Sequence, residues 1–143
     1  MILTPYTIAH NLIGVHEVPG AKSHPLIEWM LSLCSPDGMH SDETPWCSAF
    51  VNGVAELCGC ARSRSLAARS WLKIGTPVDI TLARVGWDVV ILSRPPNEWA
   101  GHVGFFAAID STTVAVLAGN QSDEVNIQRF PLDRVLGVRR IGT

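Results

Sequence analysis

The chain has 143 residues, a formal net charge of -2, and a composition that is 47% hydrophobic and 17% charged. These values predict one compact domain over residues 1–143, and the lack of a basic run argues against a nucleic-acid surface or an electrostatic membrane patch. No apolar run approaches the roughly 20 residues of a membrane span, so we expect no membrane insertion.

Helical spacing of apolar residues dominates the first half of the chain. The first and third predicted helices each begin with a threonine cap followed by a proline, and a glycine closes each of them. A proline also opens the second helix, and the fourth ends at a glycine. The four helices are predicted over residues 4–14, 23–34, 44–59 and 65–74.

Cys47 is the third residue of the predicted helix that Thr44 caps and Pro45 starts. There its sulfur meets backbone N–H groups without intrahelical partners, at the positive end of the helix dipole. Both favour thiolate over thiol, so we expect a lowered pKa and a nucleophilic role for Cys47. The alternative is a buried, inert cysteine.

From Asp88 onward the residues become β-branched and the helical spacing disappears, which predicts a sheet in the second half. A proline-rich loop over residues 94–99 separates the first two strands. The strands are expected over residues 88–92, 101–109, 113–118, 125–130 and 135–141.

His102 lies in the second of these strands, on the face opposite Val103. If residues 110–112 form the turn, Ile109 pairs with Thr113 and His102 comes opposite Asn120. A slip of one residue would turn Asn120 to the other face. Gly101 and Gly104 are expected to leave room beside His102 for a ligand or partner.

Cys47, His102 and Asn120 together match the nucleophile, base and orienting group of a cysteine hydrolase. His16 and His40 lie in predicted loops and are the alternatives for the base. The other three cysteines are expected to be reduced thiols, and their spacings do not match zinc modules, so no metal is expected. They are Cys34, Cys58 and Cys60.

Four segments carry a resemblance to a known family, over about residues 6–140. The motif D-E-T-P-W-C-S-A-F-V-N at 42–52 is the most specific, and the others are A-R-S-W-L at 68–72, G-H-V-G-F at 101–105 and G-N-Q at 119–121. In this order they resemble the small phage-type peptidoglycan hydrolases of the NlpC/P60 and CHAP superfamily, in particular the phage and prophage branch with D-E-T-P-W-C-S. Ala118 departs from the family, which more often has a glycine there, and Trp87 separates Gly86 from Asp88.

The resemblance implies a papain-like α+β fold, with N-terminal helices and the cysteine helix packed on a C-terminal antiparallel sheet. It implies that residues 1–143 are a single catalytic domain with Cys47 as nucleophile, His102 as base and Asn120 as the polar third member. The expected activity is endolysin-like hydrolysis of an amide bond in the peptide part of bacterial peptidoglycan, by a monomer without a cofactor. The rival interpretations are an injected antibacterial toxin, a virion-associated lysin and a non-catalytic wall-binding module.

Five residues are expected at the substrate. The carboxylates among them would bind a substrate amine or be solvated rim charges, and the tryptophans would be cleft walls or core. They are Trp46, Asp42, Glu43, Trp99 and Gln121. Because the N-terminus lacks a signal-peptide pattern, we expect synthesis in the cytoplasm of the host bacterium and holin-dependent or other non-Sec release to the cell wall.

Overall fold

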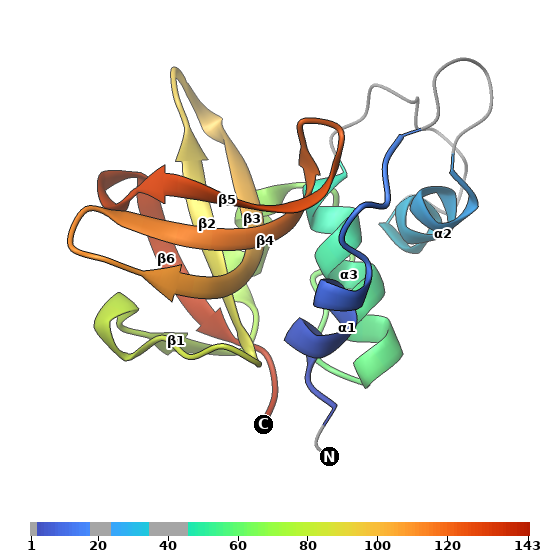
Figure 1. The fold of residues 1–143 in the computed structure, drawn as a ribbon, viewed down its shortest axis with the longest axis horizontal. Helices are drawn as coiled ribbons and strands as arrows, with labels where there is room; N and C mark the ends of the chain where they lie inside the picture. The colour runs from blue at the N-terminus through green and yellow to red at the C-terminus, as the bar shows by residue number, and fades with distance from the viewer. Residues whose placement is uncertain (1–2, 18–23, 35–45) are drawn as a thin grey trace.

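The computed structural model describes residues 3–17, 24–34 and 46–143. Three α-helices come first, and six strands with three short 3-10 helices (η) follow (Figure 1). In chain order the elements are α1 (Pro5–Asn11), α2 (Pro25–Cys34), α3 (Cys47–Cys58), η1 (Ala68–Lys73), β1 (Thr76–Val78), η2 (Ile80–Leu82), β2 (Asp88–Arg94), β3 (Asn97–Ile109), β4 (Thr113–Gln121), β5 (Glu124–Pro131), η3 (Leu132–Arg134) and β6 (Val135–Arg140).

The helix ends follow the capping residues where the structure describes them. The Thr4 side chain caps α1 by accepting the backbone N–H of Thr7 at 3.2 Å. Gly59 ends α3 with φ of 68°, a left-handed conformation that glycine adopts easily. The predicted start of this helix, Thr44 and Pro45, lies outside the described residues. The helix begins at Cys47, which is therefore its first residue and not its third.

Three sequence-based boundaries differ from the structure. The helix expected over 65–74 is a single 3-10 segment, η1. The loop expected over 94–99 is only a turn at Pro95–Pro96, because Arg94 already pairs with Asn97 across β2 and β3. The three residues of β1, which include Pro77, were not predicted as a strand; they pair with the edge of β6.

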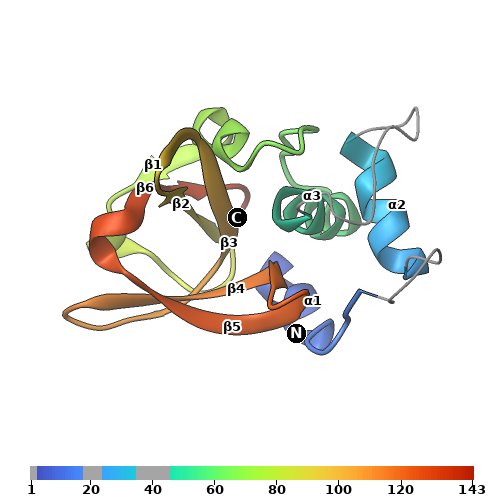
Figure 2. The same ribbon diagram turned by 90° about the horizontal axis from the view of Figure 1, so that it is seen from above.

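All strands pair antiparallel in one sheet of order β1-β6-β2-β3-β4-β5. Helix α3 lies between this sheet and α2 (Figures 1 and 2). Phe50 of α3 meets Phe105 of β3 edge-on, with ring centroids 6.2 Å apart. The expected α+β fold is confirmed: N-terminal helices, with the cysteine helix packed on a C-terminal antiparallel sheet in the papain-like arrangement.

The two faces of the sheet bury two separate clusters, because successive strand residues alternate between faces. Val103, Phe105 and Leu117 face α3. The opposite face holds Leu92, Phe106, Val116 and Ala118, with Phe130 packed against them. In the described part of the chain, no helix is both long and apolar enough to cross a membrane.

The predicted register of the β3–β4 hairpin is wrong next to the turn and right beyond the bulge. Ile109 pairs with Val114 and not with Thr113, and the pairing shifts between Phe106 and Ala108, which is a β-bulge. The turn is tightened by the Asp110 carboxylate, which accepts the N–H groups of Thr112 and Thr113 at 2.9 and 2.7 Å. The two changes cancel: past the bulge, Phe105 pairs with Leu117, as the prediction requires, and no pairing of His102 with β4 is described.

Candidate active site

Cys47 is held at the start of α3 against the middle of β3, and only 2% of its surface is exposed. The backbone N–H groups of Val103, Ser48 and Cys47 itself act on the sulfur and lower its pKa. The described register between β3 and β4 ends at Phe105 and Leu117, so the Val103 N–H is available to the sulfur. The thiol therefore lies where β3 is not paired to β4.

The expected lowering of the Cys47 pKa is not what the structure gives. Burial raises the pKa of this thiol, and this effect outweighs the three N–H groups and the nearby Arg94 guanidinium, which lower it. The helix N-terminus acts as expected, but loss of solvation has the larger effect because Cys47 is only 2% exposed. The resting residue is thus a neutral thiol.

His102 is bound to Gln121 and not to Asn120. Its Nε2 lies 3.0 Å from Gln121 Oε1, while the amide nitrogen of Gln121 donates to the carbonyl oxygen and Oδ1 of Asn126 at 2.8 and 2.9 Å. Since the amide nitrogen has its own acceptors, Oε1 must accept, and the ring N–H must be on Nε2. The remaining ring nitrogen, Nδ1, is then an unprotonated base atom.

The surroundings of His102 keep its ring neutral. The ring is buried on the sheet face opposite Val103, with its centroid 5.4 Å from that of Phe130. Burial lowers the pKa of His102 to about 4, although the Gln121 hydrogen bond opposes this, and the positive charges of Arg94 and Arg134 lower it further. Nδ1 is buried without a hydrogen-bond partner in the described part of the protein, so no hydrogen bond joins it to Cys47 there.

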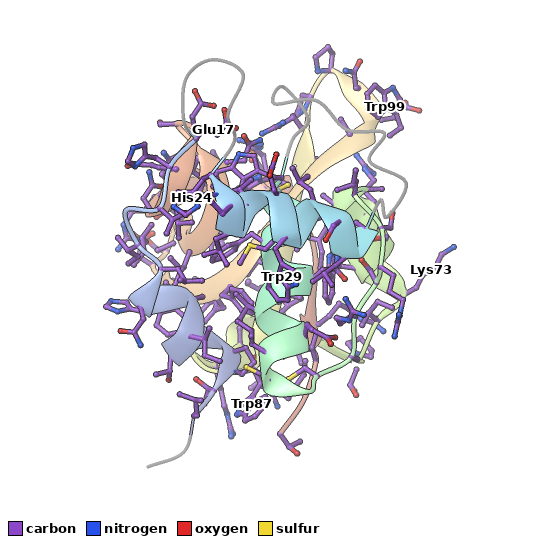
Figure 3. The ribbon with its side chains drawn as sticks, turned by 90° about the vertical axis from the view of Figure 1, so that its right-hand side faces the viewer. Glu17, His24, Trp29, Lys73, Trp87 and Trp99 are labelled. Atoms are coloured by element: carbon purple, nitrogen blue, oxygen red, sulfur yellow. The ribbon has the colours of Figure 1, made fainter. Side chains whose placement is uncertain are left out.

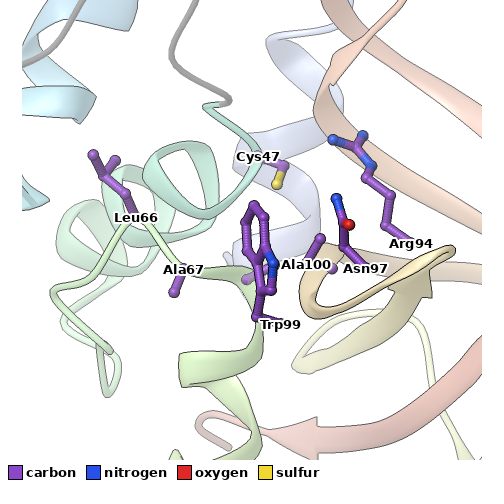
Figure 4. Close-up of a pocket in the computed structure, with 9 residues that line it drawn as sticks. Cys47, Leu66, Ala67, Arg94, Asn97, Trp99 and Ala100 are labelled. Carbon is purple, nitrogen blue, oxygen red and sulfur yellow. The ribbon is translucent and has the colours of Figure 1, made fainter.

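A pocket of about 300 Å³ opens beside the thiol. This volume is at the lower end of the range for small-molecule sites. Its walls come from the start of α3, the chain that leads into η1, and the β2–β3 hairpin (Figure 4). The lining residues are Cys47, Leu66, Ala67, Ala68, Arg94, Asn97, Trp99, Ala100 and Gly101.

A buried polar network fixes one wall of this pocket to α3. Asn52 Oδ1 accepts the backbone N–H of Arg64 at 2.8 Å, and Ser48 Oγ donates to the carbonyl of Ser65 at 2.6 Å. The indole N–H of Trp71 donates to Ser48 Oγ at 3.0 Å. Ser48 and Asn52 belong to the motif around Cys47, and their partners show that they position the loop before Leu66. Sequence reasoning had assigned them no role; their polarity on the helix was the available signal.

The structure separates the five residues expected at the substrate. Trp46 is core, because it is 1% exposed and its indole N–H donates to the Glu17 carboxylate. Gln121 is buried and occupied by His102 and Asn126, so it does not face a substrate. Trp99 is 78% exposed at the tip of the β2–β3 hairpin (Figure 3) and lines the pocket. Asp42 and Glu43 lie outside the described residues.

The glycines beside His102 do not leave open space. A Cβ at Gly104 would lie 2.5 Å from Val116 Cγ1, so β4 fills that position. A Cβ at Gly101 would lie 3.2 Å from Arg69 Cγ, in the side chain whose Nε holds the carbonyl of Ala100. Both glycines permit close packing, and Gly101 also lines the pocket described above.

Asn120 is half-buried in the left-handed region, with φ of 61°. This conformation turns the chain and points the next residue, Gln121, at the histidine ring. The expected contact of Asn120 with His102 is not formed, and Gln121 takes that position; the register beyond the bulge is the predicted one, so the left-handed turn at Asn120 is the local difference.

No protein-family model matches the chain, and no curated protein matches it. Among solved structures, the chain is similar to an NlpC/P60 family protein from Bacillus cereus ATCC 10987, with 18% sequence identity and a TM-score of 0.47. The match covers 66% of this chain and 31% of that chain, so this chain spans about a third of that protein's length. The superfamily and its phage branch stay predictions from the motifs.

Among the described residues, no group of three or more His, Cys, Asp or Glu side chains could hold a metal ion. Cys34, Cys58 and Cys60 are free thiols, as is Cys47. Of the expected alternative bases, His16 does not line the pocket: it is exposed, with Nδ1 3.0 Å from the Gly14 carbonyl oxygen. His40 lies outside the described residues.

Proposed function

We propose that this chain is a cysteine hydrolase that cleaves an amide bond in the peptide part of bacterial peptidoglycan. Cys47 is the nucleophile, His102 the base, and Gln121 the group that orients the ring. The observation that carries the proposal is the position of the Cys47 thiol, at the start of α3 and in the wall of a pocket. Gln121 holds the proton of His102 on Nε2 and leaves Nδ1 as a buried base atom.

The proposed reaction starts from a neutral thiol and a neutral imidazole. The sulfur attacks the scissile carbonyl carbon while its proton passes to Nδ1, as in a serine hydrolase and unlike a preformed thiolate–imidazolium pair. The imidazolium then protonates the leaving amine as the C–N bond breaks. Water, deprotonated by His102, attacks the thioester and releases the acid and the thiol. The Cys47 N–H is a donor for the oxyanion.

This reaction requires the sulfur and Nδ1 to come into contact when substrate binds. Catalytic hydrogen bonds are often long or misaligned before substrate is present. Cys47 packs on the Val103 face of the sheet and His102 lies on the opposite face, so the contact requires β3 to rearrange around residues 102 and 103, where no pairing with β4 is described. A peptide in the pocket would displace solvent there and favour this contact.

A wall-binding module without catalysis is the second candidate. It is favoured by the raised pKa of Cys47 and by the missing hydrogen bond to His102 Nδ1. In that case Cys47 is part of the core and the pocket only binds. An injected toxin or virion-associated lysin would use the proposed chemistry, as would an endolysin made in the cytoplasm and released through a holin.

The test uses purified peptidoglycan sacculi and two proteins, the wild type and Cys47→Ala. We expect wild-type protein to clear the suspension and to release fragments whose masses identify the cleaved amide, and Cys47→Ala to release none. Co-sedimentation with sacculi, measured for both proteins, reports binding. Binding by both with no fragment from either would establish the wall-binding module and refute the hydrolase.

A further inference from the structure

Arg94 is the only charged side chain among the described residues that line the pocket. It stands at the end of β2, beside the pocket that contains the Cys47 sulfur (Figure 4). It is exposed, and in the parts of the chain that the structure describes it makes no hydrogen bond or ion pair. An arginine that faces a cavity and has no carboxylate partner among the described residues can bind an anion.

The other arginines near the sheet have structural partners, which sets Arg94 apart. Their guanidinium groups bind backbone carbonyls or carboxylates and hold one element to the next. Arg69 binds the Ala100 carbonyl, Arg134 that of Ser93, Arg139 that of Ile74, Arg140 the Asp88 carboxylate, and Arg129 the Asp110 carboxylate. Arg94 has no such task in the described structure.

The neighbours of Arg94 suit one end of a peptide. Asn97, which pairs with Arg94 across the hairpin turn, adds an amide to the same pocket wall, and Trp99 adds an exposed apolar surface. The Arg94 charge is close enough to lower the pKa values of both Cys47 and His102. A group that binds the guanidinium is thus held near the reacting atoms.

We propose that Arg94, assisted by Asn97, binds a free carboxylate of the substrate close to the scissile carbonyl and so determines specificity. The preferred substrate is an acidic peptide. The same peptide should be a poorer substrate when that carboxylate is converted to a carboxamide. A guanidinium fork matches a carboxylate with two parallel hydrogen bonds and cannot do so with a neutral amide. This inference rests on the proposed function, because that function places the scissile amide bond beside Cys47.

The experiment compares two peptides that differ only by carboxylate or carboxamide, with wild type, Arg94→Gln, Arg94→Lys and the control Arg84→Gln. Arg84 is exposed beside a different pocket, near the C-terminus. We expect wild type and Arg84→Gln to favour the carboxylate peptide by about tenfold or more in kcat/KM. Arg94→Gln should lose this preference, mainly through KM, and Arg94→Lys should keep part of it because it retains the charge without the fork.

Two results would overturn the inference. One is a preference in Arg94→Gln equal to that of wild type. The other is an equal fall in kcat on both peptides, because Arg94 would then act on the transition state and not on the substrate carboxylate. Circular dichroism spectra verify that all variants fold. If Arg94→Gln does not fold, the peptide preference of Arg94→Lys, the smaller change, tests the inference.

A binding measurement separates this inference from the proposed function. Calorimetric titration of both peptides into Cys47→Ala, with and without Arg94→Gln, reports carboxylate recognition without any cleavage. If binding depends on the carboxylate and requires Arg94 but wild type cleaves neither peptide, the proposed hydrolase function is refuted and the Arg94 carboxylate site is supported. Equal binding of both peptides would refute the site even if wild type cleaves them.

Discussion

Replacing Gln121 by Met tests the assignment of the group that orients His102. Methionine has a similar length and volume but cannot accept the ring N–H, so the change removes polarity and little packing. Gln121 is 3% exposed, and it holds His102 Nε2 at 3.0 Å and Asn126 at 2.8 and 2.9 Å. We expect a less stable protein with much lower activity.

The stability loss follows from these contacts. An unpaired buried ring N–H costs about 1–3 kcal/mol, and the two hydrogen bonds to Asn126 contribute about 1 kcal/mol each. The sum is about 3–5 kcal/mol, which corresponds to a fall in Tm of roughly 6–20 °C for a chain of this size. Urea and thermal unfolding followed by circular dichroism measure both quantities.

Asn120→Gly is the matched control. Glycine keeps the positive φ of 61° without strain, whereas alanine would add a backbone penalty to any loss of function. We expect stability and hydrolysis near wild type. Gln121→Glu retains an acceptor and should recover part of the activity lost in Gln121→Met. A loss under 1 kcal/mol in Gln121→Met, with a larger loss in Asn120→Gly, would refute the assignment.

Three further predictions concern the same site. The free energy of unfolding should fall by up to about 3 kcal/mol as the pH drops from about 6.5 to about 4, because the unfolded chain, with the ordinary His pKa, takes up a proton before buried His102 does. No such loss is expected above about pH 6.5. The free energy of unfolding, measured by urea unfolding at several pH values, should depend less on pH in His102→Gln than in wild type. The same pH dependence in both proteins would contradict the burial argument. Cys47→Ala and Cys47→Ser should unfold like wild type yet release no fragments from sacculi, whereas single alanine variants of Cys34, Cys58 and Cys60 stay active, as does the wild type after EDTA treatment. Asn52→Ala should lower stability by about 2–4 kcal/mol, because it unpairs the buried N–H of Arg64; exposed Ser32→Ala is the control, and equal urea midpoints for the two would argue against the network.

Local signals predicted the elements well. The Thr4–Pro5 start, the Gly59 end and the alternation of His102 and Val103 are set by residues near one another in the chain, so capping and period suffice to find them. The position of Cys47 near β3 depends on packing, and only the resemblance to a family predicted it. The position of Trp99 at a cleft also depends on packing.

Two features escaped sequence reasoning for a physical reason. The count along the hairpin gives the right register beyond the bulge, but it does not reveal the left-handed conformation of Asn120, after which Gln121 contacts His102. The pKa of Cys47 is decided by how much protein covers the sulfur, which the helix alone does not reveal. Both errors concern long-range contacts.

The contact between Trp46 and Gly119 has a consequence for how this protein can change. A Cβ at position 119 would lie 2.3 Å from the Trp46 ring, so β4 touches the residue immediately before Cys47. A side chain at 119 would move the start of α3, and the sulfur with it, away from β3. We therefore expect positions 46 and 119 to vary together among related sequences: a residue larger than glycine at 119 should occur with a side chain smaller than tryptophan at 46.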